Sequence, residues 1–312
     1  MSAALELNDK ILTPLLPQIA EKHLGESTKI LRCLGGGSFG RAYLALTPSR
    51  GKIVLKAYRI PGMNEDEAFQ LEILQKNTDV PMPQVLFTHT DDTAAVMGMG
   101  YIEGKNAMSA GFLRHGRRKR EAFAAAVVDG ILGWHAVRGE KYGYVREPKY
   151  ASWREFYREE IVTPVMEGTA PLVEQGKFKR RWYDTLRCAT EQFDAIVDEP
   201  PHPVLIHGDL NIMNIMAEPG SFRLTGFIDP WGSMWADREY DLFQLQNMWG
   251  NRFGLYEEYK RRYPLTPACD LKTAYYAAIN EALAYLRSGV MFAPFNALWD
   301  KRLRKMLRRQ NA

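Results

Sequence analysis

The chain is poor in cysteine, with only three in 312 residues. Cys33, Cys188 and Cys269 lie far apart, and none belongs to a C-x-x-C pair. The sequence therefore favours neither a disulfide framework nor a cysteine-bound structural metal. It also lacks the basic segment followed by an apolar core that would indicate a signal peptide. Together these absences predict a protein of a reducing compartment, and we expect it in the cytoplasm.

The chain also lacks a long uninterrupted apolar run. Its most apolar stretch, residues 122–137, contains Asp129 and His135 and is too short to cross a bilayer. We therefore expect no membrane partner. There is no internal repeat, and the apolar and charged fractions of 46% and 25% are those of an ordinary globular protein. The length allows one large domain or two lobes.

Positive charge is unevenly distributed along the chain. Residues 1–104 hold 10 Lys and Arg against 12 Asp and Glu, whereas residues 105–312 hold 31 against 25. Much of the surplus lies in two clusters, at 114–120 and 301–309. Such clusters can bind nucleic acid, but neither contains the interleaved aromatic residues of a base-stacking surface. We expect solvated helix faces and no nucleic-acid partner.

The most informative stretch reads VLIHGDLNIMNIM and, a few residues later, RLTGFIDPWGSMWADREYDL. An apolar run at 204–206 predicts a buried strand that leads into His207 and Asp209. Asn214 follows, and a second predicted strand ends on Asp229. We expect the two carboxylates and the carboxamide to converge at the ends of adjacent short strands. Such oxygen ligands suit Mg²⁺, and they leave one carboxylate to accept a hydroxyl proton.

A glycine-rich segment, LGGGSFG, lies near the N-terminus. Gly35, Gly37 and Gly40 fit the pattern G-x-G-x-x-G, in which glycine lets the backbone approach phosphate groups closely. The same pattern occurs in dinucleotide-binding folds, where the loop opens directly into a helix. Here the following segments, 43–46 and 53–58, are predicted strands, so the pattern indicates a glycine-rich β-hairpin.

Lys56 lies in the middle of the apolar strand IVLKAY. A buried lysine is costly unless it is paired. The best candidate partner is Glu72, inside a predicted helix at 65–76. Alternatives near the start of that helix, where the helix dipole favours acids anyway, are Glu65, Asp66 and Glu67.

The remaining elements follow from periodicity. Residues 5–24 predict one or two short helices, and strands are expected at 85–88 and 94–99. The segment MGYIEG then connects to a helical region. There the helices are expected at 117–137, 151–167, 178–197, 242–249, 255–263, 270–288 and 296–309. His135 lies on an apolar helix face and is expected to be a hydrogen-bonded core residue.

The spacing H-x-D-x-x-x-x-N, followed by a lone Asp after an apolar strand, resembles the catalytic core of the protein-kinase-like fold. The HGD form with ADREYDLF downstream is similar to the aminoglycoside phosphotransferase superfamily, which includes choline, homoserine and fructosamine kinases. The resemblance covers nearly the whole chain from about residue 29. It implies an α+β, bilobal protein-kinase-like fold. An N-lobe (1–98) would hold an antiparallel five-stranded sheet and one helix. A hinge (99–104) would lead to a mostly helical C-lobe (105–312) with a small strand pair.

The same resemblance implies transfer of a phosphoryl group from ATP to a hydroxyl of a small molecule, with Mg²⁺ as cofactor. Asp209 would accept or orient the hydroxyl. Asn214 and Asp229 would hold Mg²⁺. His207 and Asp241 would support the catalytic loop, with Asp237 and Arg238 as weaker candidates for that task. The nucleotide would be bound by Gly35, Gly37, Ser38, Gly40, Lys56, Glu72, Gly100 and Ile102.

The acceptor is less well defined. GFIDPWGSMWADREYDLF resembles antibiotic phosphotransferases, whereas FGLYEEYKRRYPL and the longer helical tail resemble fructosamine kinases. Asn211, however, stands where fructosamine kinases carry Trp. The positive surplus after residue 104 favours an acceptor with at most one or two positive charges, such as an amino sugar or a ketoamine. An aminoglycoside-type antibiotic phosphotransferase remains an alternative, and Glu155, Glu159, Glu160 and Glu167 could form an acidic wall for it.

Two further classes stay open. A protein kinase is disfavoured because no A-P-E follows Asp229 and because Asp241 comes only twelve residues later. A nucleotide-binding pseudokinase scaffold is disfavoured because the positions expected to do chemistry carry competent residues. We expect a monomer or a weak dimer.

Overall fold

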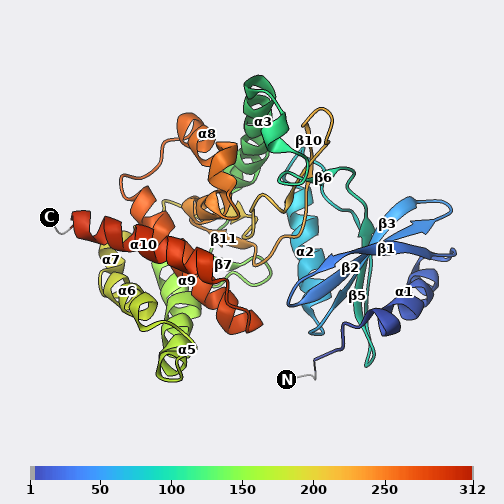
Figure 1. Ribbon diagram of the computed structural model, residues 1–312, viewed down its shortest axis with the longest axis horizontal. Coiled ribbons are helices and arrows are strands. Elements are labelled where there is room, and N and C mark those ends of the chain that lie inside the picture. The colour runs from blue at the N-terminus through green and yellow to red at the C-terminus, as the bar shows by residue number, and fades with distance from the viewer. Residues whose placement is uncertain (1–3, 311–312) are drawn as a thin grey trace. The chain divides into compact units, whose positions relative to one another are not determined.

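The structure is a computed structural model that describes residues 4–310. Two compact units are present, one formed by residues up to 112 together with 214–231, and the other by 113–213 together with the chain from 232 onward. This division differs from the expected one at 99–104, because the segment that holds Asn214 and Asp229 groups with the N-terminal part. The predicted five-stranded sheet and the helical C-terminal part are both present (Figure 1).

The main sheet of the first unit is antiparallel throughout and has the strand order β1-β2-β3-β5-β4. In its central strand, Lys56 lies opposite Ala42 on one side and Met97 on the other. Each predicted strand is present: β2, β3 and β4 are longer than expected, and β5 is shifted by one residue. Their bounds are β1 (Lys29–Gly36), β2 (Gly40–Thr47), β3 (Gly51–Tyr58), β4 (Val85–Thr90) and β5 (Ala95–Gly100).

Helices α1 (Asp9–Leu24) and α2 (Met63–Gln75) cover opposite faces of this sheet (Figure 1). Leu55 and Ala57 belong to an apolar core shared with the buried face of α1. The residue between them, Lys56, faces α2 and pairs with a side chain of that helix. The strand's alternation of side chains between faces thus separates an apolar core from a charged one.

Helix α1 is a single element, although Pro14 and Pro17 lie inside it. Asn8 caps its start by accepting a hydrogen bond from the Lys10 backbone N–H at 2.9 Å. Gly25 ends it in a left-handed conformation, with φ 70°. The sequence allowed one helix or two short ones in this region, and the structure has one.

The strands on either side of His207, Asp209, Asn214 and Asp229 in the sequence belong to two small sheets, one in each unit. The first unit holds the order β10-β9-β6 and the second holds β7-β11-β8. The expected adjacency of the strand before Asp209 to those around Asn214 and Asp229 is therefore wrong, because β8 pairs with β11 instead. The bounds are β6 (Lys105–Asn106), β7 (Gly143–Tyr144), β8 (Val204–Ile206), β9 (Ile215–Ala217), β10 (Leu224–Phe227) and β11 (Met234–Ala236).

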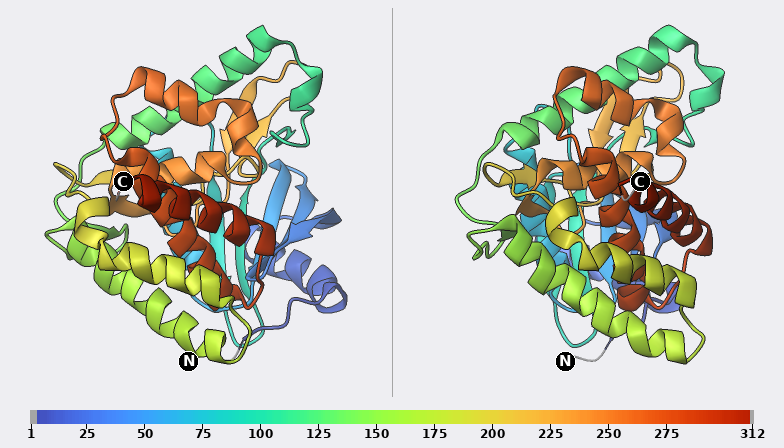
Figure 2. Two further views of the ribbon diagram at one scale, coloured as in Figure 1. Left: turned by 60° about the vertical axis from the view of Figure 1, so that its left-hand side comes forward. Right: turned by 90° about the vertical axis from the view of Figure 1, so that its left-hand side faces the viewer.

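The second unit is mostly helical, and α9 packs against α5, α6 and α10 (Figure 2). Its core includes an aromatic cluster in which Trp153, Tyr157, Tyr240 and Tyr276 stack or meet edge to face. The α-helices are α3 (Arg117–Ala136), α4 (Trp153–Phe156), α5 (Thr163–Glu174), α6 (Arg180–Glu191), α7 (Phe193–Ile196), α8 (Leu255–Arg262), α9 (Cys269–Ser288) and α10 (Ala293–Gln310). The 3₁₀ segments are η1 (Phe112–Arg114), η3 (Arg238–Gln246) and η4 (Gly250–Phe253).

The helix expected at 151–167 is divided. A π-helical segment, η2 (Tyr157–Val162), separates α4 from α5. Pro164 stands at the start of α5. It has no backbone N–H to donate to the carbonyl four residues earlier, and its ring clashes with that carbonyl. Widening the preceding turn accommodates the ring. Among the described residues, no helix is long and apolar enough to span a membrane.

Candidate active site

Lys56 is held between two carboxylates of the first unit. Its Nζ lies 2.6 Å from Oε2 and 2.9 Å from Oε1 of Glu67, and it also bonds the Asp229 carboxylate. Tyr58 donates its hydroxyl to Glu67 Oε2 at 2.8 Å. The Glu67 side chain is only 2% exposed, whereas that of Asp229 is 48% exposed. The lysine thus connects a buried anchor to a carboxylate that faces solvent.

The charges of this group follow from burial and pairing. Burial alone would lower the pKa of Lys56, but the charges of Asp229 and Glu67 outweigh it and raise that pKa above its ordinary value. Burial raises the pKa of Glu67 to about 7, although the Lys56 ammonium opposes the shift. Lys56 is therefore a firmly cationic group, placed where it can contact an anion.

Glu72, the expected partner of Lys56, is not the residue that pairs with it. Glu67 shares the inward stripe of α2 with Leu71 and Leu74, at i, i+4 and i+7, and these three are buried. Glu72 is exposed, since it lies five residues and about 140° around the helix from Glu67. The 67–71–74 spacing is the sequence signal that identifies the correct acid.

Asn214 and Asp229, the expected metal ligands, lie together in the first unit. Asn214 Nδ2 donates to the Asp229 backbone carbonyl at 3.4 Å, and the Ile228 N–H donates to the Asn214 carbonyl at 3.0 Å. Asp229 has a positive φ of 58°, a conformation that costs a non-glycine residue on the order of 1 kcal/mol. Their carboxylate and amide oxygens are hard ligands of the kind that Mg²⁺ prefers.

The glycine-rich segment forms the β1–β2 hairpin that the sequence predicts, and the Gly37 N–H closes it onto the Gly40 carbonyl at 2.9 Å. A Cβ on Gly40 would lie 3.2 Å from the Ala57 carbonyl oxygen and 3.3 Å from Cε of Lys56. Glycine there allows the hairpin to pass closely over the lysine. Ser38 lies at the tip of this turn, while Gly35 has a positive φ of 142° in β1.

Two aromatic residues pack against each other at the tip of the hairpin, and no sequence motif marks either of them. The Phe39 ring stacks on Trp231, with centroids 5.1 Å apart and planes inclined by 15°. Trp231 follows Asp229 by two residues, so the stack ties the hairpin to the segment that carries the expected metal ligand. The Arg59 N–H adds a hydrogen bond to the Phe39 carbonyl at 2.8 Å.

Gly100 and Ile102, the expected adenine contacts, lie at and just after the end of β5. The Gly100 N–H donates to the Gln84 carbonyl at 2.8 Å. Ile102 packs over β10, where a Cβ on Gly226 would come within 2.8 Å of its Cγ2. The segment after β5 therefore packs on the small sheet whose strand β10 precedes Asp229.

In the second unit, Asp241 organises the turn that carries Asp209. Its carboxylate is fully buried and accepts the backbone N–H groups of His207 and Gly208, each at 2.9 Å. Gly208 has a positive φ of 84°, and its carbonyl accepts from Gln244 at 3.3 Å. The Asp241 carboxylate therefore fixes the turn by bonding the backbone N–H groups of the turn rather than its side chains.

His135 completes the Asp241 network from helix α3. Its Nε2 lies 3.3 Å from Asp241, and its Nδ1 lies 2.7 Å from the Tyr259 hydroxyl. Both contacts are satisfied if Nε2–H donates to the carboxylate and the tyrosine donates to Nδ1. Burial lowers the pKa of His135, although Asp241 opposes the shift. The expected role of a hydrogen-bonded core histidine agrees with these contacts.

Asp209 is oriented by a neighbour within its own loop. Asn211 Nδ2 donates to Asp209 Oδ1 at 2.8 Å, and Asn211 Oδ1 accepts the Met213 N–H at 2.9 Å. The Asp209 N–H lies 3.3 Å from the His207 ring nitrogen Nδ1. His207 therefore supports the loop, and Asn211 acquires a positioning contact that the sequence did not indicate.

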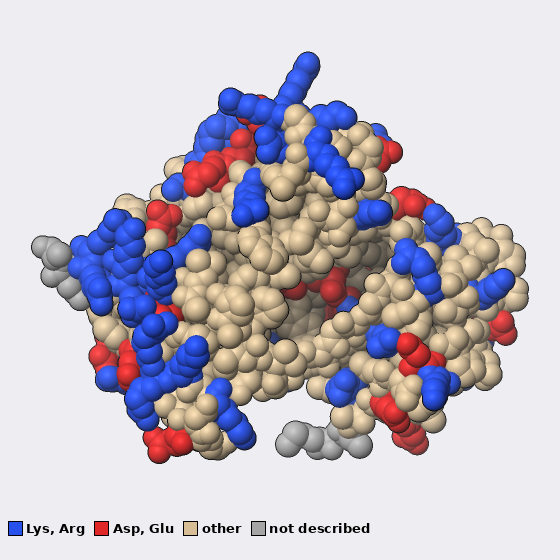
Figure 3. Space-filling view, viewed as in Figure 1, with Lys and Arg blue, Asp and Glu red and all other residues tan. Residues whose placement is uncertain are grey.

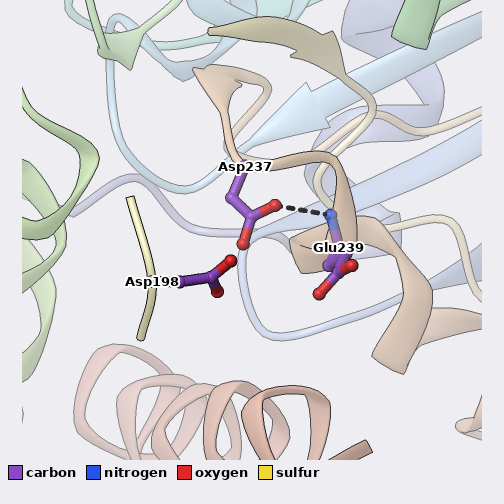
Figure 4. Close-up of side chains that lie close together, drawn as sticks. All are labelled: Asp198, Asp237 and Glu239. Atoms are coloured by element: carbon purple, nitrogen blue, oxygen red, sulfur yellow. Dashed lines mark hydrogen bonds between the residues drawn. The ribbon is translucent and has the colours of Figure 1, made fainter. Parts of the chain in front are cut away.

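A second group of carboxylates lies under η3. Asp198, Asp237 and Glu239 approach one another closely (Figure 4), and their oxygens lie 2.5, 2.8 and 2.8 Å from Nζ of Lys272. Among the described residues this is the one acidic group with metal-like spacing, but its centre is occupied by an ammonium. The group is a structural ion cluster, and Asp237 belongs to it rather than to the Asp241 network.

The fold is that of the protein-kinase-like class, and the family match makes the chain a member of a phosphotransferase family. The chain belongs to the phosphotransferase enzyme family that includes the aminoglycoside phosphotransferases, whose profile matches residues 30–272. It is 23% identical to the uncharacterized protein YcbJ of Escherichia coli (strain K12) over 232 residues, which are 72% of this chain and 76% of that protein.

Solved structures show the same fold. A candidate fructosamine-3-kinase from Thermobifida fusca matches with a TM-score of 0.70 and 19% identity, covering 94% of this chain and 98% of that one. The GDP complex of aminoglycoside 2'-phosphotransferase-IIIa matches with a TM-score of 0.64 and 15% identity, covering 94% and 97%. The expected protein-kinase-like fold is therefore confirmed.

Proposed function

We propose that this protein is an ATP- and Mg²⁺-dependent small-molecule kinase. It transfers the γ-phosphoryl group to a hydroxyl of a sugar-like or amino-containing metabolite, such as an amino sugar or a ketoamine. The observation that carries the proposal is the Lys56–Glu67–Asp229 group. It sets a cationic lysine beside a solvent-facing carboxylate, under a glycine hairpin that can approach phosphates.

The chain's own residues supply binding and orientation. Lys56, anchored by Glu67, contacts the nucleotide phosphates. The Gly35–Gly40 turn offers backbone N–H groups to the same phosphates. Asn214 and Asp229 would hold Mg²⁺, which when bound neutralises charge on the phosphates as the bond breaks. Phosphoryl transfer needs little covalent chemistry from the protein, so accurate placement of these groups accounts for the rate.

Asp209 accepts or orients the acceptor hydroxyl. Its carboxylate receives the Asn211 amide, and its loop is fixed by Asp241. A carboxylate held in this way needs no rotation before it takes the hydroxyl proton, and so less entropy is lost in the transition state. Asn211 is accordingly a positioning residue for Asp209.

The acceptor is inferred to carry few positive charges. The chain after residue 104 has a surplus of positive charge. Of the four acids that could form an acidic wall, Glu160 is engaged by Lys149 at 2.9 Å and by the Tyr150 hydroxyl at 2.5 Å. A polycation would gain little from such a wall. The fold similarity to a candidate fructosamine-3-kinase supports a ketoamine as the first compound to test.

An antibiotic phosphotransferase is the second candidate. Aminoglycoside 2'-phosphotransferase-IIIa has the same fold over nearly its whole length, and Glu155, Glu159 and Glu167 are exposed. Under this alternative, a kanamycin-type polycation would be phosphorylated efficiently at physiological ionic strength, where surface attraction is screened beyond about 8 Å.

An ATP-consumption screen over ketoamines, amino sugars, choline-like alcohols and aminoglycosides tests the proposal, with Asp209→Asn as the inactive control. We expect turnover of a singly charged metabolite and at least tenfold lower kcat/KM for kanamycin-type compounds. Efficient turnover of the aminoglycosides instead would establish the second candidate. Asp229→Ala should abolish the Mg²⁺ dependence of nucleotide binding. Nucleotide binding without turnover of any acceptor, unchanged by Asp209→Asn, would favour the scaffold interpretation.

A further inference from the structure

Lys and Arg gather on one face of the second unit, where the C-terminal half of α10 packs against α6 (Figure 3). A groove of about 680 Å³ lies between Arg180 and Arg181 on α6 and Arg304 and Arg308 on α10. A second hollow of about 520 Å³, bordered by Lys301 and Arg309 among others, shares Arg304 and Arg308 with it. The sequence cluster at 301–309 is thus completed by arginines about 120 residues earlier in the chain. We call the two hollows the α6–α10 groove.

Two of the guanidinium groups of this groove, those of Arg181 and Arg304, are positioned by one buried carboxylate. Asp300 is 3% exposed and accepts the Thr185 hydroxyl at 2.7 Å. Its carboxylate lies 3.2 Å from Arg181 Nη2 and 3.1 Å from Arg304 Nη2. One buried carboxylate therefore positions arginines from both walls. Each guanidinium has five N–H donors in a fixed fork, so donors remain for a ligand.

Asp184 also lines the first hollow, so the positive charge of the groove is partly but not fully compensated. Within the described part of the chain, no ion pair is formed by Lys301, Lys305, Arg308 or Arg309. The other basic cluster differs, because Arg117 there pairs with Glu121 of its own helix at 2.7 Å. Charge, concavity and a buried organising carboxylate coincide only at the α6–α10 groove among the cavities described.

The chemistry of the lining selects the ligand. Guanidinium forks match the paired oxygens of phosphate groups. No aromatic side chain is among the described residues that line either hollow, so there is no platform for stacking bases. The hollows are concave and within the volume range of small-ligand sites, unlike a flat surface for a bilayer. We propose that the α6–α10 groove binds a small molecule that carries several phosphate groups.

This site is separate from the proposed phosphoryl-transfer chemistry, with which it shares no residue. The test is isothermal titration of the full chain with inorganic tripolyphosphate. The variant Lys305→Gln/Arg308→Gln removes two exposed charges from the groove. The matched control Arg114→Gln/Arg118→Gln removes two exposed charges from the other cluster. We expect the dissociation constant to rise at least tenfold in the groove variant and to stay within twofold of wild type in the control.

A second variant separates a built site from a general field of positive charge. Asp300→Asn makes the groove more positive by one charge, so simple attraction predicts tighter binding. If Asp300 positions Arg181 and Arg304 as proposed, binding weakens several-fold instead. Tighter binding in Asp300→Asn would overturn the proposal. Equal losses of affinity in the groove variant and its control would also overturn it. Unchanged affinity in both variants would overturn it too and would assign tripolyphosphate binding to the nucleotide site.

The remaining arms use an RNA duplex and vesicles that contain phosphatidylserine, under the same salt conditions. We expect the groove variant to change the dissociation constant for the duplex and that for the vesicles by no more than twofold. Groove-dependent binding of the duplex or of the vesicles, without groove-dependent binding of tripolyphosphate, would contradict the small-ligand proposal and show that the groove is a surface for a macromolecule. Circular dichroism and thermal midpoints confirm that each variant is folded.

Discussion

Within the described residues, each unit of the molecule contains a buried or largely buried lysine paired with several carboxylates, and the two groups differ in exposure and backbone conformation. Lys272 of the second unit meets Asp198, Asp237 and Glu239, and its side chain is 1% exposed. Lys56 of the first unit meets Glu67 and Asp229. We call these the closed ring and the open ring. The chemical groups are alike, so their identity alone does not distinguish a structural cluster from a site.

The exposure of the lysine and the backbone conformation make the distinction. Lys56 is 15% exposed and Lys272 only 1%, whereas Asp198 of the closed ring is 42% exposed, nearly as much as Asp229. In the closed ring the carboxylates have further protein partners: Asp237 accepts the Tyr276 hydroxyl at 2.9 Å, and Glu239 accepts both donors of Thr266. In the open ring, Asp229 is about half exposed and held in a left-handed conformation. A carboxylate that faces solvent can exchange a lysine for a metal ion, whereas Asp237 and Glu239 are buried and already bonded to Tyr276 and Thr266.

The largest expected effect is on folding. Lys272→Met leaves Asp237 and Glu239 buried without their cation, and loss of one partner from such a cluster costs about 3–5 kcal/mol. Urea unfolding measures the loss. Lys260→Met, at an exposed pair 3.8 Å from Asp270, is the control and should cost less than about 1 kcal/mol. Equal stability of the two variants would remove the structural role from the closed ring.

In the open ring, loss of the lysine should reduce activity more than it reduces stability. Lys56→Met removes a phosphate contact, and we expect kcat for the proposed transfer to fall by about 100-fold or more, as when an electrostatic donor is removed from a transition state. Its free energy of unfolding should fall by less than that of Lys272→Met, because only one buried carboxylate, Glu67, loses its cation, while Asp229 can be solvated. A large stability loss at unchanged specific activity would make Lys56 a structural residue and erase the contrast between the rings.

A smaller effect distinguishes two acids on one helix. Glu67→Gln weakens a charge-assisted anchor of Lys56 and should lower kcat/KM by about tenfold, equivalent to about 1.4 kcal/mol. Glu72→Gln changes an exposed residue on the other face of α2 and should remain within twofold of wild type. The pair is matched in chemistry and in helix. The reverse order of effects would restore Glu72 as the partner of Lys56.

The smallest effect is a pH dependence in the second unit, outside its ring. Burial lowers the pKa of His135 below its ordinary value of 6.5, so the unfolded chain binds a proton there more readily than the folded one. That contribution to stability is present above pH 6.5 and is lost as the pH falls. The stability advantage of wild type over His135→Gln, measured by urea midpoints at pH 7.5 and 5.5, should narrow at the lower pH. A constant or widening difference would show that the histidine is not held neutral.

The sequence predicts the main sheet and the placement of Lys56 well, because strand alternation and glycine spacing are local patterns. The H-x-D-x-x-x-x-N motif likewise places Asp209 and Asn214 at strand ends. It does not reveal that these strand ends belong to different sheets. Strand pairing is decided by contacts between distant segments, as when β8 takes β11 as its neighbour.

The choice of Glu67 over Glu72 could have been read from the 67–71–74 stripe, which marks the buried face of α2. Other features could not be predicted, because they depend on contacts between distant segments. The stack of Phe39 on Trp231 and the association of Arg180 with the 301–309 cluster join residues more than 100 positions apart. Neither carries a spacing signal in the sequence.

The first unit is discontinuous in the chain, and this matters during synthesis. Its sheet β10-β9-β6 needs residues 214–231, yet β6 ends at Asn106. A ribosome that adds about 5–20 residues per second needs roughly 5–25 seconds to make the intervening segment. Throughout that delay the nascent N-terminal part has Lys56 and Glu67 but not Asp229. The carboxylate that would hold the metal therefore arrives last, after most of the second unit's first half has left the ribosome.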